Sequence, residues 1–422
     1  MRRLLPCFHG DGGEQEDTPN IAMAYSTSTA TASSSTVPSG ASGSINASDM
    51  SVESMQQRQY PSFVDRPANL RVFSFSELRA ATRNLSRSLM LGEGGFGCVY
   101  RGTILNGSGS AQEEEVAVKH LNRNGLQGHK EWLTEVNVLG IVDHPNLVKL
   151  IGYCAQDDER GPQRLLVYEL MPNRSVDDHL SGRAIGTTLS WRTRLKVALH
   201  AARGLSYLHH DMDFQIIFRD LKTSNILLDQ HWNAKLSDFG MAREGPTEGL
   251  THVSTAVVGT LGYAAPEYIQ TGRLTAKSDV WTYGVLLYEL ITGRRPLDRN
   301  RPRSEQKLLD WVRPYISDTT KLKLIVDPKL EGNYNIRSVA KLATVANRCL
   351  ARLPRARPRM SEVLDMVQKA MDVDLATSTS DHDQAPLHCY GACGEEDVKQ
   401  RKGKKAGLLW VLLASLTRSR PS

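Results

Sequence analysis

A polar string in the second half of the chain has residue types and spacing that suit phosphoryl transfer. In Phe218-Arg-Asp-Leu-Lys-Thr-Ser-Asn225, Asp220 can accept the proton of a substrate hydroxyl and orient that hydroxyl for in-line attack. Asn225 can ligate a second Mg²⁺, and Asp238, in the string Asp-Phe-Gly, suits the main Mg²⁺ site. Phosphoryl transfer gives a protein little covalent work, so these groups would supply mainly positioning and charge neutralisation.

A glycine-rich string earlier in the chain suits phosphate groups. It matches G-x-G-x-x-G, and its glycines let backbone N–H groups approach phosphates without obstruction. Dinucleotide-dependent oxidoreductases use the same string. Here Val99 and then the strand-like Val116-Ala-Val-Lys119 follow, which favours a strand–turn–strand over the strand–turn–helix of a dinucleotide site. The residues of the string are Gly92, Glu93, Gly94, Gly95, Phe96 and Gly97.

Lys119 is suited to pair with the α- and β-phosphates of a nucleotide. Its expected ion-pair partner is Glu135 in the next helix, with Glu131 as the alternative. Lys222, two residues after Asp220, marks specificity for serine and threonine rather than tyrosine. The main rival function is a scaffold that binds nucleotide or partners without catalysis. Such scaffolds typically lose the strand lysine, the loop aspartate or the metal-binding aspartate, and all three are present.

These residues need strands and helices to bring them together. Strand patterns surround the glycine string and recur at 116–119, 147–152 and 165–170, whereas 130–139 has helical periodicity. Beyond Arg183 the strong apolar patterns are helical, at 189–209, 278–292, 308–316, 338–350 and 360–371. A strand-rich unit followed by a helix-rich unit predicts an α+β fold with a cleft between two lobes.

Composition narrows the class of protein. Of 422 residues, 40% are hydrophobic and 23% charged, which allows a large core. The six cysteines have no framework spacing and no apolar signal-peptide core follows Met1, so a reducing, intracellular setting is expected. The longest apolar run, 408–416, is too short to span a bilayer. The net charge of +6 would suit an anionic membrane or nucleic acid, but Lys and Arg are spread over the whole chain, which favours a solvated surface and no nucleic-acid partner.

Residues from about Arg71 to Met371 resemble a eukaryotic protein kinase. More narrowly, they are similar to the receptor-like cytoplasmic kinases of plants (subfamily VII), above all to those named for compromised pattern-triggered immunity. Besides the strings above, the resemblance rests on Phe73-Ser-Phe-Ser-Glu-Leu, Gly128-His-Lys-Glu-Trp, His252-Val-Ser-Thr, Gly259-Thr-Leu-Gly-Tyr-Ala-Ala-Pro-Glu-Tyr268, Asp279-Val-Trp, Gly293-Arg-Arg-Pro-Leu and Arg357-Pro-Arg-Met-Ser-Glu-Val.

The resemblance implies a bilobal kinase fold, ATP with Mg²⁺, protein substrates, and upstream receptor kinases or co-receptors as partners in plant immune signalling. It implies that the nucleotide contacts the backbone of Glu169 and Met171, behind Tyr168 as gatekeeper. An ion pair between Glu267 and Arg357 is implied as structural rather than catalytic. The implied ATP site also includes Val99, Ala117, Lys119 and Leu227.

The resemblance and the composition together divide the chain into four segments. They are a disordered Ser/Thr-rich tail at 1–70, a family docking segment at 71–86, the kinase domain at 87–371 and a mostly disordered basic tail with a short apolar run at 372–422. Order is expected to return near Phe73, with Ser76 as the cap of a helix through Arg83.

Phe218 departs from the family, because catalytic loops usually have His at this position. In kinases that ring packs against the phenylalanine of Asp-Phe-Gly, in an apolar spine that would include Leu139 and Leu150 here. Phe keeps this packing and loses only a polar contact, so activity is expected to survive.

Regulation is expected in the segment between Asp-Phe-Gly and Ala-Pro-Glu. In the family, the arginine at position 219 belongs to a basic pocket that a phosphorylated activation loop neutralises. The candidate phosphorylation sites are Thr251, Ser254, Thr255 and Thr260. Resemblance favours Ser254 and Thr255 as switch sites and gives Thr260 a contact with the substrate or the catalytic loop. The alternative is a flexible loop without a switch.

Cys7, preceded by Arg2 and Arg3, is a candidate for S-acylation, whereas Arg2 in place of glycine rules out N-myristoylation. One acyl chain with nearby basic residues would give peripheral attachment to the cytoplasmic face of the plasma membrane. An unmodified thiol would leave the protein in the cytoplasm. The basic and apolar segment 399–416 stays open to three interpretations: a peripheral membrane segment, a nuclear-import run or a tail without a role.

Overall fold

The structure is a computed structural model that describes residues 70–380, apart from 95–96, 106–111, 123–125, 160, 185, 187 and 317. The described residues all belong to one compact unit, Tyr60–Ser422. Cys7, Gly95 and Phe96 lie outside the described residues. So do nearly all of the N-terminal tail and the chain beyond Ser380, where the predictions about disorder and membrane attachment fall.

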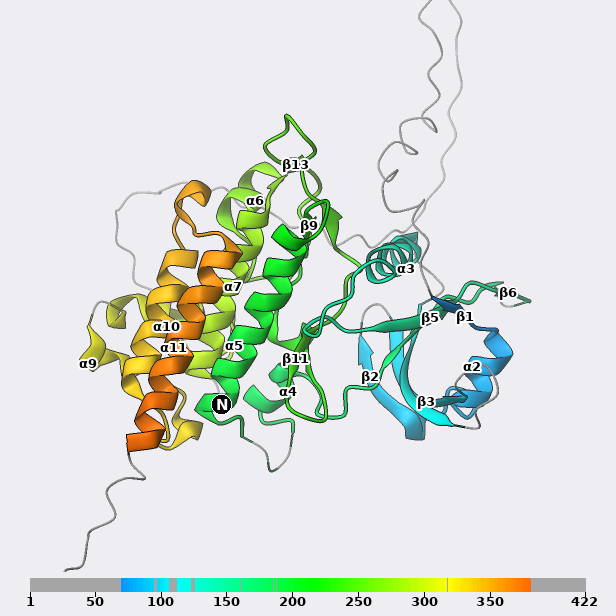
Figure 1. The fold of residues 1–422 in the computed structure, drawn as a ribbon, viewed down its shortest axis with the longest axis horizontal. Helices are drawn as coiled ribbons and strands as arrows, with labels where there is room; N and C mark the ends of the chain where they lie inside the picture. Colours follow the sequence, from blue (N-terminus) through cyan, green and yellow to red (C-terminus); the bar gives the residue numbers. More distant parts are fainter. Residues whose placement is uncertain are drawn as a thin grey trace, which may run out of the picture. The chain divides into compact units, whose positions relative to one another are not determined.

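A mixed six-stranded sheet forms the N-terminal lobe (Figure 1). Its order is β1-β5-β8-β4-β3-β2, in which β1 and β5 run parallel and all other neighbours antiparallel. The strands are β1 (Arg71–Val72), β2 (Met90–Gly94), β3 (Gly97–Leu105), β4 (Glu113–Leu121), β5 (Leu150–Cys154) and β8 (Leu165–Glu169), and the flanking helices are α2 (Phe75–Ala81) and α3 (Leu126–Leu139).

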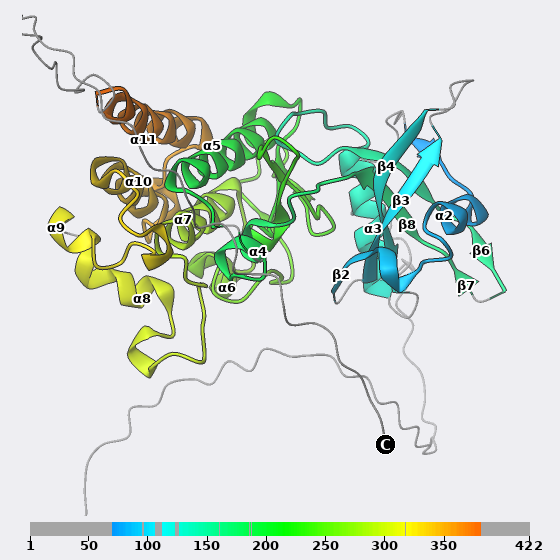
Figure 2. The same ribbon diagram turned by 90° about the horizontal axis from the view of Figure 1, so that it is seen from below.

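Helices cover both faces of this sheet, which explains the uninterrupted apolar run in β8. Successive residues of a strand point to opposite faces. Leu166 and Tyr168 therefore join the main core cluster with α3, whereas Leu165 and Val167 join a second cluster with Leu78 of α2. Figure 2 shows α3 and α2 on the two sides of the strands.

The segment 71–86 packs on the sheet lobe through the parallel pairing of β1 with β5. The sequence predicted Ser76 as the cap of its helix, and this is wrong. The helix begins at Phe75, and Ser74 caps it by accepting a hydrogen bond from the N–H of Glu77. The helix also ends before Arg83, whose φ of 50° is left-handed and incompatible with a continuing α-helix.

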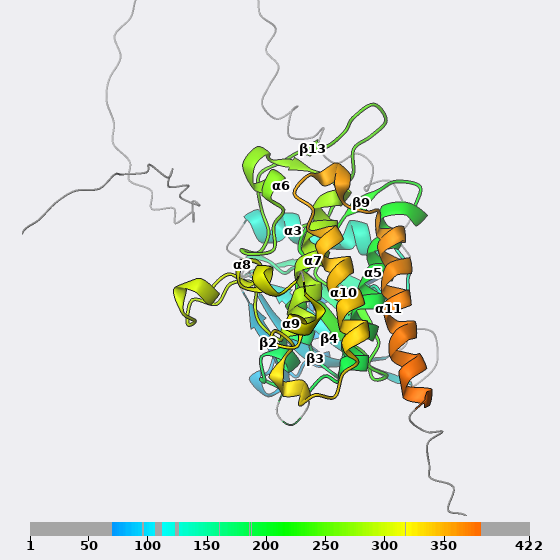
Figure 3. The ribbon, with the colours of Figure 1, turned by 90° about the vertical axis from the view of Figure 1, so that its left-hand side faces the viewer.

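Helices build the C-terminal lobe: α4 (Val176–Leu180), α5 (Trp191–Ser206), α6 (Pro266–Thr271), α7 (Ala276–Thr292), α8 (Leu308–Val312), α9 (Thr319–Leu322), α10 (Ile336–Cys349) and α11 (Met360–Ser380). A π-helical turn, Tyr207–Asp211, follows α5. From Ser278 to Thr292 every residue of α7 except Trp281 is buried, as expected of a helix at the centre of a core. Helices α5 and α10 contact α7, and α11 packs on α5 and α10 (Figure 3).

Short strand pairs frame the loops between these helices. They are β9 (Ile216–Ile217) with β12 (Arg243–Glu244), β10 (Ile226–Leu228) with β11 (Ala234–Leu236), β13 (Val253–Ser254) with β14 (Arg273–Leu274), and β6 (Asp157–Asp158) with β7 (Gly161–Pro162). The first three pairs flank the catalytic string, the Asp-Phe-Gly string and the activation segment.

The two-lobed α+β architecture predicted from the sequence is confirmed, whereas several element boundaries differ. Strand β5 starts at Leu150, and Leu147 forms only an isolated bridge to Leu236. Helix α8 stops at Val312, two residues before a proline that cannot continue it. Helix α11 continues to Ser380, past the predicted boundary at Met371. None of the described helices is long and apolar enough to cross a membrane.

Candidate active site

A cleft of about 820 Å³ lies between the lobes, and residues predicted from the sequence line it. Gly94 pairs with Gly97, so the described residues of the glycine string lie in two adjacent antiparallel strands, as predicted, rather than in a strand and a helix. Gly97 has a φ of 142°, and a Cβ there would lie 2.1 Å from the carbonyl oxygen of His120, so this position requires glycine. The predicted residues in the lining are Gly92, Glu93, Gly94, Gly97, Val99, Ala117, Lys119, Tyr168, Glu169, Met171, Asn225, Leu227 and Asp238.

Lys119 joins the two lobes at the inner end of this cleft. Its Nζ lies 2.6 Å from Glu135 Oε1 and 2.9 Å from Asp238 Oδ1. Glu135, rather than Glu131, is thus the carboxylate of α3 that pairs with the strand lysine. Glu131 instead packs on Gly240, where an added Cβ would lie 2.9 Å from its own Cβ.

Tyr168 makes a contact that the sequence did not reveal. Its hydroxyl donates a hydrogen bond to Glu135 Oε2, so the buried carboxylate of Glu135 is held by the lysine on one oxygen and by the tyrosine on the other. The position behind the hinge was predicted for Tyr168, but the hydrogen bond depends on how closely α3 approaches β8. No pattern along the chain reports that distance.

Burial and the neighbouring charges act in opposite directions on the pKa values of Lys119, Glu135 and Asp238. Burial raises the pKa of Glu135 to about 7, and the Lys119 ammonium limits that rise. Burial disfavours the Lys119 ammonium, but the charges of Glu135 and Asp238 outweigh it and raise the pKa of Lys119 above its ordinary value. Burial also opposes ionisation of Asp238, but Lys119 lowers the pKa of Asp238 below its usual range. Lys119 and Asp238 therefore stay charged at neutral pH.

The catalytic string places Asp220 at the centre of a second polar cluster. Lys222 Nζ lies 2.7 Å from Asp220 Oδ2, and the amide Nδ2 of Asn225 donates to the same oxygen at 3.0 Å. The hydroxyl of Thr260 donates to Asp220 Oδ1 at 2.8 Å and accepts from Lys222 Nζ at 3.2 Å. Thr260 thus contacts the catalytic loop, as the resemblance implied. A phosphate on this hydroxyl would lie against the Asp220 carboxylate.

Asp279 at the start of α7 holds the backbone of the catalytic string. Its carboxylate accepts the N–H of Phe218 at 2.8 Å and the N–H of Arg219 at 2.9 Å. The ring of Phe218 packs against that of Phe239, with centroids 4.9 Å apart and edge to face, in one core cluster with Leu139 and Leu150. Phe therefore keeps the packing expected of the usual His.

The family model described as protein tyrosine and serine/threonine kinase matches residues 85–367 of this chain. This chain belongs to the protein kinase family. It is 59% identical over 406 residues to serine/threonine-protein kinase PCRK1 of Arabidopsis thaliana, with 96% of each chain covered. It is 62% identical over 352 residues to serine/threonine-protein kinase PCRK2 of the same plant, with 83% of this chain and 84% of that protein covered. It is also 51% identical over 317 residues to serine/threonine-protein kinase PBL34 of Arabidopsis thaliana, with 74% of this chain and 63% of that protein covered.

The chain is therefore a plant serine/threonine protein kinase of the receptor-like cytoplasmic kinase group, as the sequence resemblance implied. A protein kinase uses ATP and acts on protein substrates, so the cleft between the lobes is the expected place for the nucleotide.

The activation segment of this kinase contacts Arg219 of the catalytic string. Arg219 donates to the carbonyl of Ala256 at 3.1 Å and to the hydroxyl of Tyr268 at 2.6 Å. The predicted switch sites precede Ala256: Ser254 is exposed in β13, and the N–H of Thr255 donates to the carbonyl of Gly272 at 3.1 Å. The guanidinium of Arg219 thus lies next to the segment in which the resemblance places phosphorylation.

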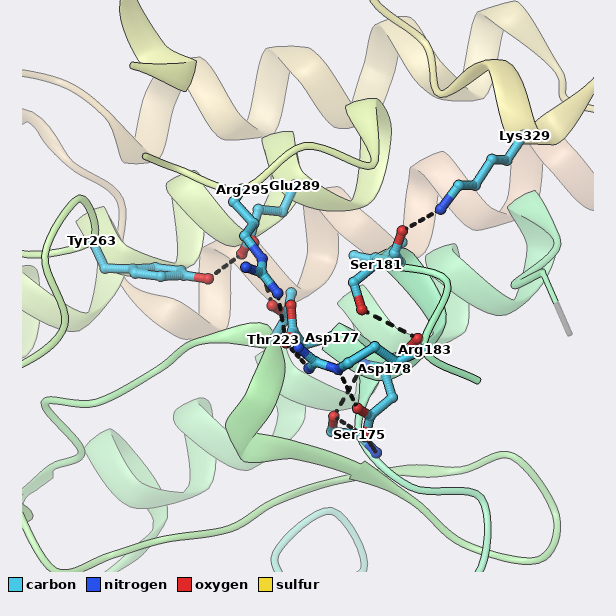
Figure 4. Close-up of polar contacts among 11 residues, drawn as sticks. Ser175, Asp177, Asp178, Ser181, Arg183, Thr223, Tyr263, Glu289, Arg295 and Lys329 are labelled. Carbon is cyan, nitrogen blue, oxygen red and sulfur yellow. Dashed lines mark hydrogen bonds and ion pairs between the residues drawn. The ribbon is translucent and has the colours of Figure 1, made fainter. Parts of the chain in front are cut away.

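A buried glutamate on α7 ties the activation segment to the catalytic loop (Figure 4). The hydroxyl of Tyr263 donates to Glu289 Oε2 at 2.5 Å, and that of Thr223 donates to Glu289 Oε1 at 3.3 Å. Burial raises the pKa of Glu289 to about 8. Nearby, Asp177 of α4 pairs with Arg183 and lies 3.6 Å from Arg295. Sequence reasoning missed this cluster, because its members come from four separate parts of the chain.

The ion pair that the resemblance implied is present in the structure. Arg357 forms a two-pronged ion pair with Glu267, both contacts being 2.7 Å, which agrees with the implied structural pair. Sequence reasoning also missed several residues that line the cleft, among them Leu91, Val148, Ser224 and Ser237. Each of these is next to or close to a predicted residue in the sequence, but which neighbours face the cleft depends on the local backbone conformation.

Proposed function

We propose that this kinase transfers the γ-phosphoryl group of ATP with Asp220 as the base, Asp238 and Asn225 as Mg²⁺ ligands, and Lys119 as the phosphate-binding cation. The observation that supports these roles is that two polar clusters meet at one cleft, which Lys119 and Asp238 of the first cluster and Asn225 of the second cluster line. One cluster holds Lys119 between two carboxylates. The other holds Asp220 between Lys222 and Thr260.

The donor atoms suit Mg²⁺. Asp238 contacts Lys119 through Oδ1, so its Oδ2 can face a metal ion, and Asn225 uses Nδ2 for Asp220, so its Oδ1 can do the same. Mg²⁺ takes oxygen ligands, and proteins usually hold it through one or two carboxylates together with substrate phosphates. When bound, the metal neutralises charge on the phosphates.

The remaining groups position the reactants. Asp220 accepts the proton of the substrate hydroxyl and orients it, and Lys222 brings a positive charge to the place where negative charge develops. Lys119, held by Glu135, meets the phosphates from the opposite lobe. Asp279 keeps the catalytic string in place through its two backbone hydrogen bonds.

The test is phosphorylation of a generic protein substrate with radiolabelled ATP and Mg²⁺. Asp220→Asn should abolish labelling on serine and threonine while nucleotide binding, followed by thermal shift, persists. Asp310→Asn, on the exposed part of α8, is the matched control and should label normally. Labelling by Asp220→Asn at the wild-type rate would refute Asp220 as the base, and no labelling by the wild type would favour the scaffold.

Activation through Ser254 or Thr255 is part of the proposal. A phosphate there would add about −1.5 to −2 charges beside the guanidinium of Arg219. The double variant Ser254→Ala with Thr255→Ala should therefore have lower turnover than the phosphorylated wild type. Equal turnover would contradict the switch.

The proposed pathway is relay of signals from cell-surface receptor kinases in plant immunity. It is supported by the similarity to the receptor-like cytoplasmic kinases PCRK1 and PCRK2 over most of the chain. Plants that lack the kinase should show a weakened oxidative burst after treatment with a microbial elicitor. Wild-type protein should restore the burst, and Asp220→Asn should not. A burst of normal size in the mutant plants would argue against this pathway.

Attachment to the plasma membrane through S-acylated Cys7 completes the proposal. Cys7 follows two arginines, and basic residues near an acyl chain strengthen attachment to an anionic leaflet. Cys7→Ser should move the protein from the membrane fraction to the soluble fraction, whereas the control Cys393→Ser should not. Unchanged fractionation of Cys7→Ser would refute this site.

A further inference from the structure

A second cavity, of about 340 Å³, lies on the C-terminal lobe and shares no lining residue with the nucleotide cleft. Three elements meet there: the π-helical turn after α5, the first turn of α7 and the start of α11. Four of its lining residues carry basic groups, His209, His210, Lys277 and Arg359. Neither the transfer reaction nor the activation segment uses this cavity.

The backbone adds to the positive character of the cavity. Ala276 and Lys277 open α7, Met360 opens α11, and all three line the cavity. The N–H groups of a first helical turn lack partners within their helix, and the helix dipole is positive at this end, so both favour an anion. The local field acts on His210: burial lowers its pKa, and the charges of His209, Arg359 and Lys277 lower it further.

The inner wall holds a buried nitrogen without a partner. The side chain of His209 is only 1% exposed, and its Nε2 lies 2.8 Å from Asp279 Oδ2. Its Nδ1 has no hydrogen-bond partner among the residues that the structure describes. Buried polar groups nearly always have a partner, so an unpaired nitrogen in a basic cavity points to a missing ligand. Nδ1 is thus the ring nitrogen of His209 that is left for a ligand of the cavity.

Acidic residues near the cavity limit what can enter it. Asp211 and Glu362 are both exposed, and Glu362 accepts the N–H of Arg359 at 2.7 Å. These two carboxylates would repel a broad anionic surface such as a charged bilayer. A single phosphate carried on a narrow side chain can pass them and reach Lys277 and Arg359.

We propose that this cavity binds the phosphate of a phosphorylated serine or threonine side chain on a partner protein. Lys277 and Arg359 are its cationic ligands, His210 donates a ring N–H to it, and the first turns of α7 and α11 supply further donors. The site is coupled to the catalytic loop through one side chain. His209 lies between the cavity and Asp279, and Asp279 holds the backbone N–H of Phe218 at 2.8 Å.

The test is calorimetric titration of the full chain with a short, end-capped phosphoserine peptide. The nucleotide cleft is first saturated with a non-hydrolysable ATP analogue and Mg²⁺, so that the peptide phosphate cannot bind there. Saturable binding is expected to weaken at least about fivefold in Arg359→Ala or His210→Ala, because each removes a charge-assisted contact. Arg355→Ala, which removes an exposed arginine outside the cavity, is the matched control and should bind like the wild type.

Two further readouts make the result decisive. The peptide should shift the imidazole carbon resonances of His209 and His210 in the wild type, which a merely structural role of these residues would not produce. Absence of saturable binding, or equal weakening by Arg355→Ala, overturns the proposal. Binding to vesicles with 5% phosphatidylinositol 4-phosphate that is lost in Arg359→Ala, without binding of the peptide, would also overturn it in favour of a lipid headgroup.

Discussion

The hydrogen bond from Tyr168 to Glu135 gives the sharpest prediction about the active site. Tyr168→Phe keeps the volume of the ring and removes only the hydroxyl. Glu135 is fully buried, and its carboxylate has Lys119 on one oxygen and Tyr168 on the other. Loss of the hydroxyl therefore leaves one oxygen of a buried carboxylate unsatisfied, which disfavours the ionised form of Glu135.

The size of the effect follows from the structure. A hydrogen bond to a charged group contributes about 1.5–3 kcal/mol. Each pKa unit corresponds to about 1.36 kcal/mol, so loss of the bond should raise the pKa of Glu135 by about one unit or more. Burial already raises that pKa to about 7. At pH 7 the ionised fraction would then fall from about one half to about one tenth, whereas near pH 9 both proteins would be largely ionised.

The assay is kcat/KM for ATP measured from pH 6 to pH 9. The variant should be about fivefold less active than the wild type at pH 7 and differ by less than about twofold at pH 9, because only ionised Glu135 holds Lys119 in place. The matched control is Tyr283→Phe. It removes an equally buried hydroxyl, which donates to the carbonyl of Ala198 at 2.8 Å, away from the cleft. The control should lower stability and leave the pH profile unchanged.

A pH-independent ratio between Tyr168→Phe and wild type would refute this reasoning. Such a result would mean that the ionisation of Glu135 does not limit activity over this range. A parallel shift in the Tyr283→Phe control would also refute it, because the effect would then come from general loosening of the fold. Thermal denaturation of all three proteins at each pH separates these outcomes from simple unfolding.

Three further predictions concern stability. In Gly152→Ala an added Cβ would lie 2.0 Å from the carbonyl oxygen of Arg71, so β1 should be displaced. Urea denaturation should show a loss of about 2–4 kcal/mol in the free energy of unfolding. Unchanged stability would contradict the β1–β5 pairing. Burial raises the pKa of Glu289 to about 8 from an ordinary 4.5, so the folded state keeps a proton that the unfolded state loses in this window. Wild-type stability should therefore fall by about 1.4 kcal/mol per pH unit as pH rises from 4.5 to 8, and Glu289→Gln should remove that slope. Equal slopes in urea denaturation of the two proteins would contradict it. Arg357→Ala leaves the carboxylate of Glu267 without its arginine and should lower the free energy of unfolding by about 3–5 kcal/mol in the same assay. Arg357→Lys should recover only part of this loss, because lysine cannot form both contacts.

The sequence predicted the catalytic residues better than the contacts that hold those residues in place. Asp220 and Asn225 lie in one short string, and helical periodicity brings Glu135 to the face of α3 toward Lys119, so local spacing is enough to foresee both clusters. The hydrogen bond from Tyr168 and the cluster around Glu289 depend on distances between elements far apart in the chain. No periodicity encodes those distances.

The errors in element boundaries have a similar cause. Ser74 and Ser76 are both good helix caps by residue type, and only the start of the helix at Phe75 decides between them. The two-residue strand β1 is too short to show an alternating pattern, and it exists because Gly152 lets its backbone approach β5. Both features are set by tertiary contacts rather than by propensity.

Helix α7 explains how the catalytic geometry is held. Two of its buried acidic side chains point to functional segments: Asp279 binds the backbone of the catalytic string, and Glu289 joins Tyr263 to Thr223. A buried carboxyl group without partners would be costly, so each of these contacts fixes a loop to the most buried helix of the lobe. The loops that carry Asp220 and the activation segment are thereby positioned by a rigid element rather than by their own sequence. Asp220, the proposed base, thus depends for its position on a helix outside the catalytic string.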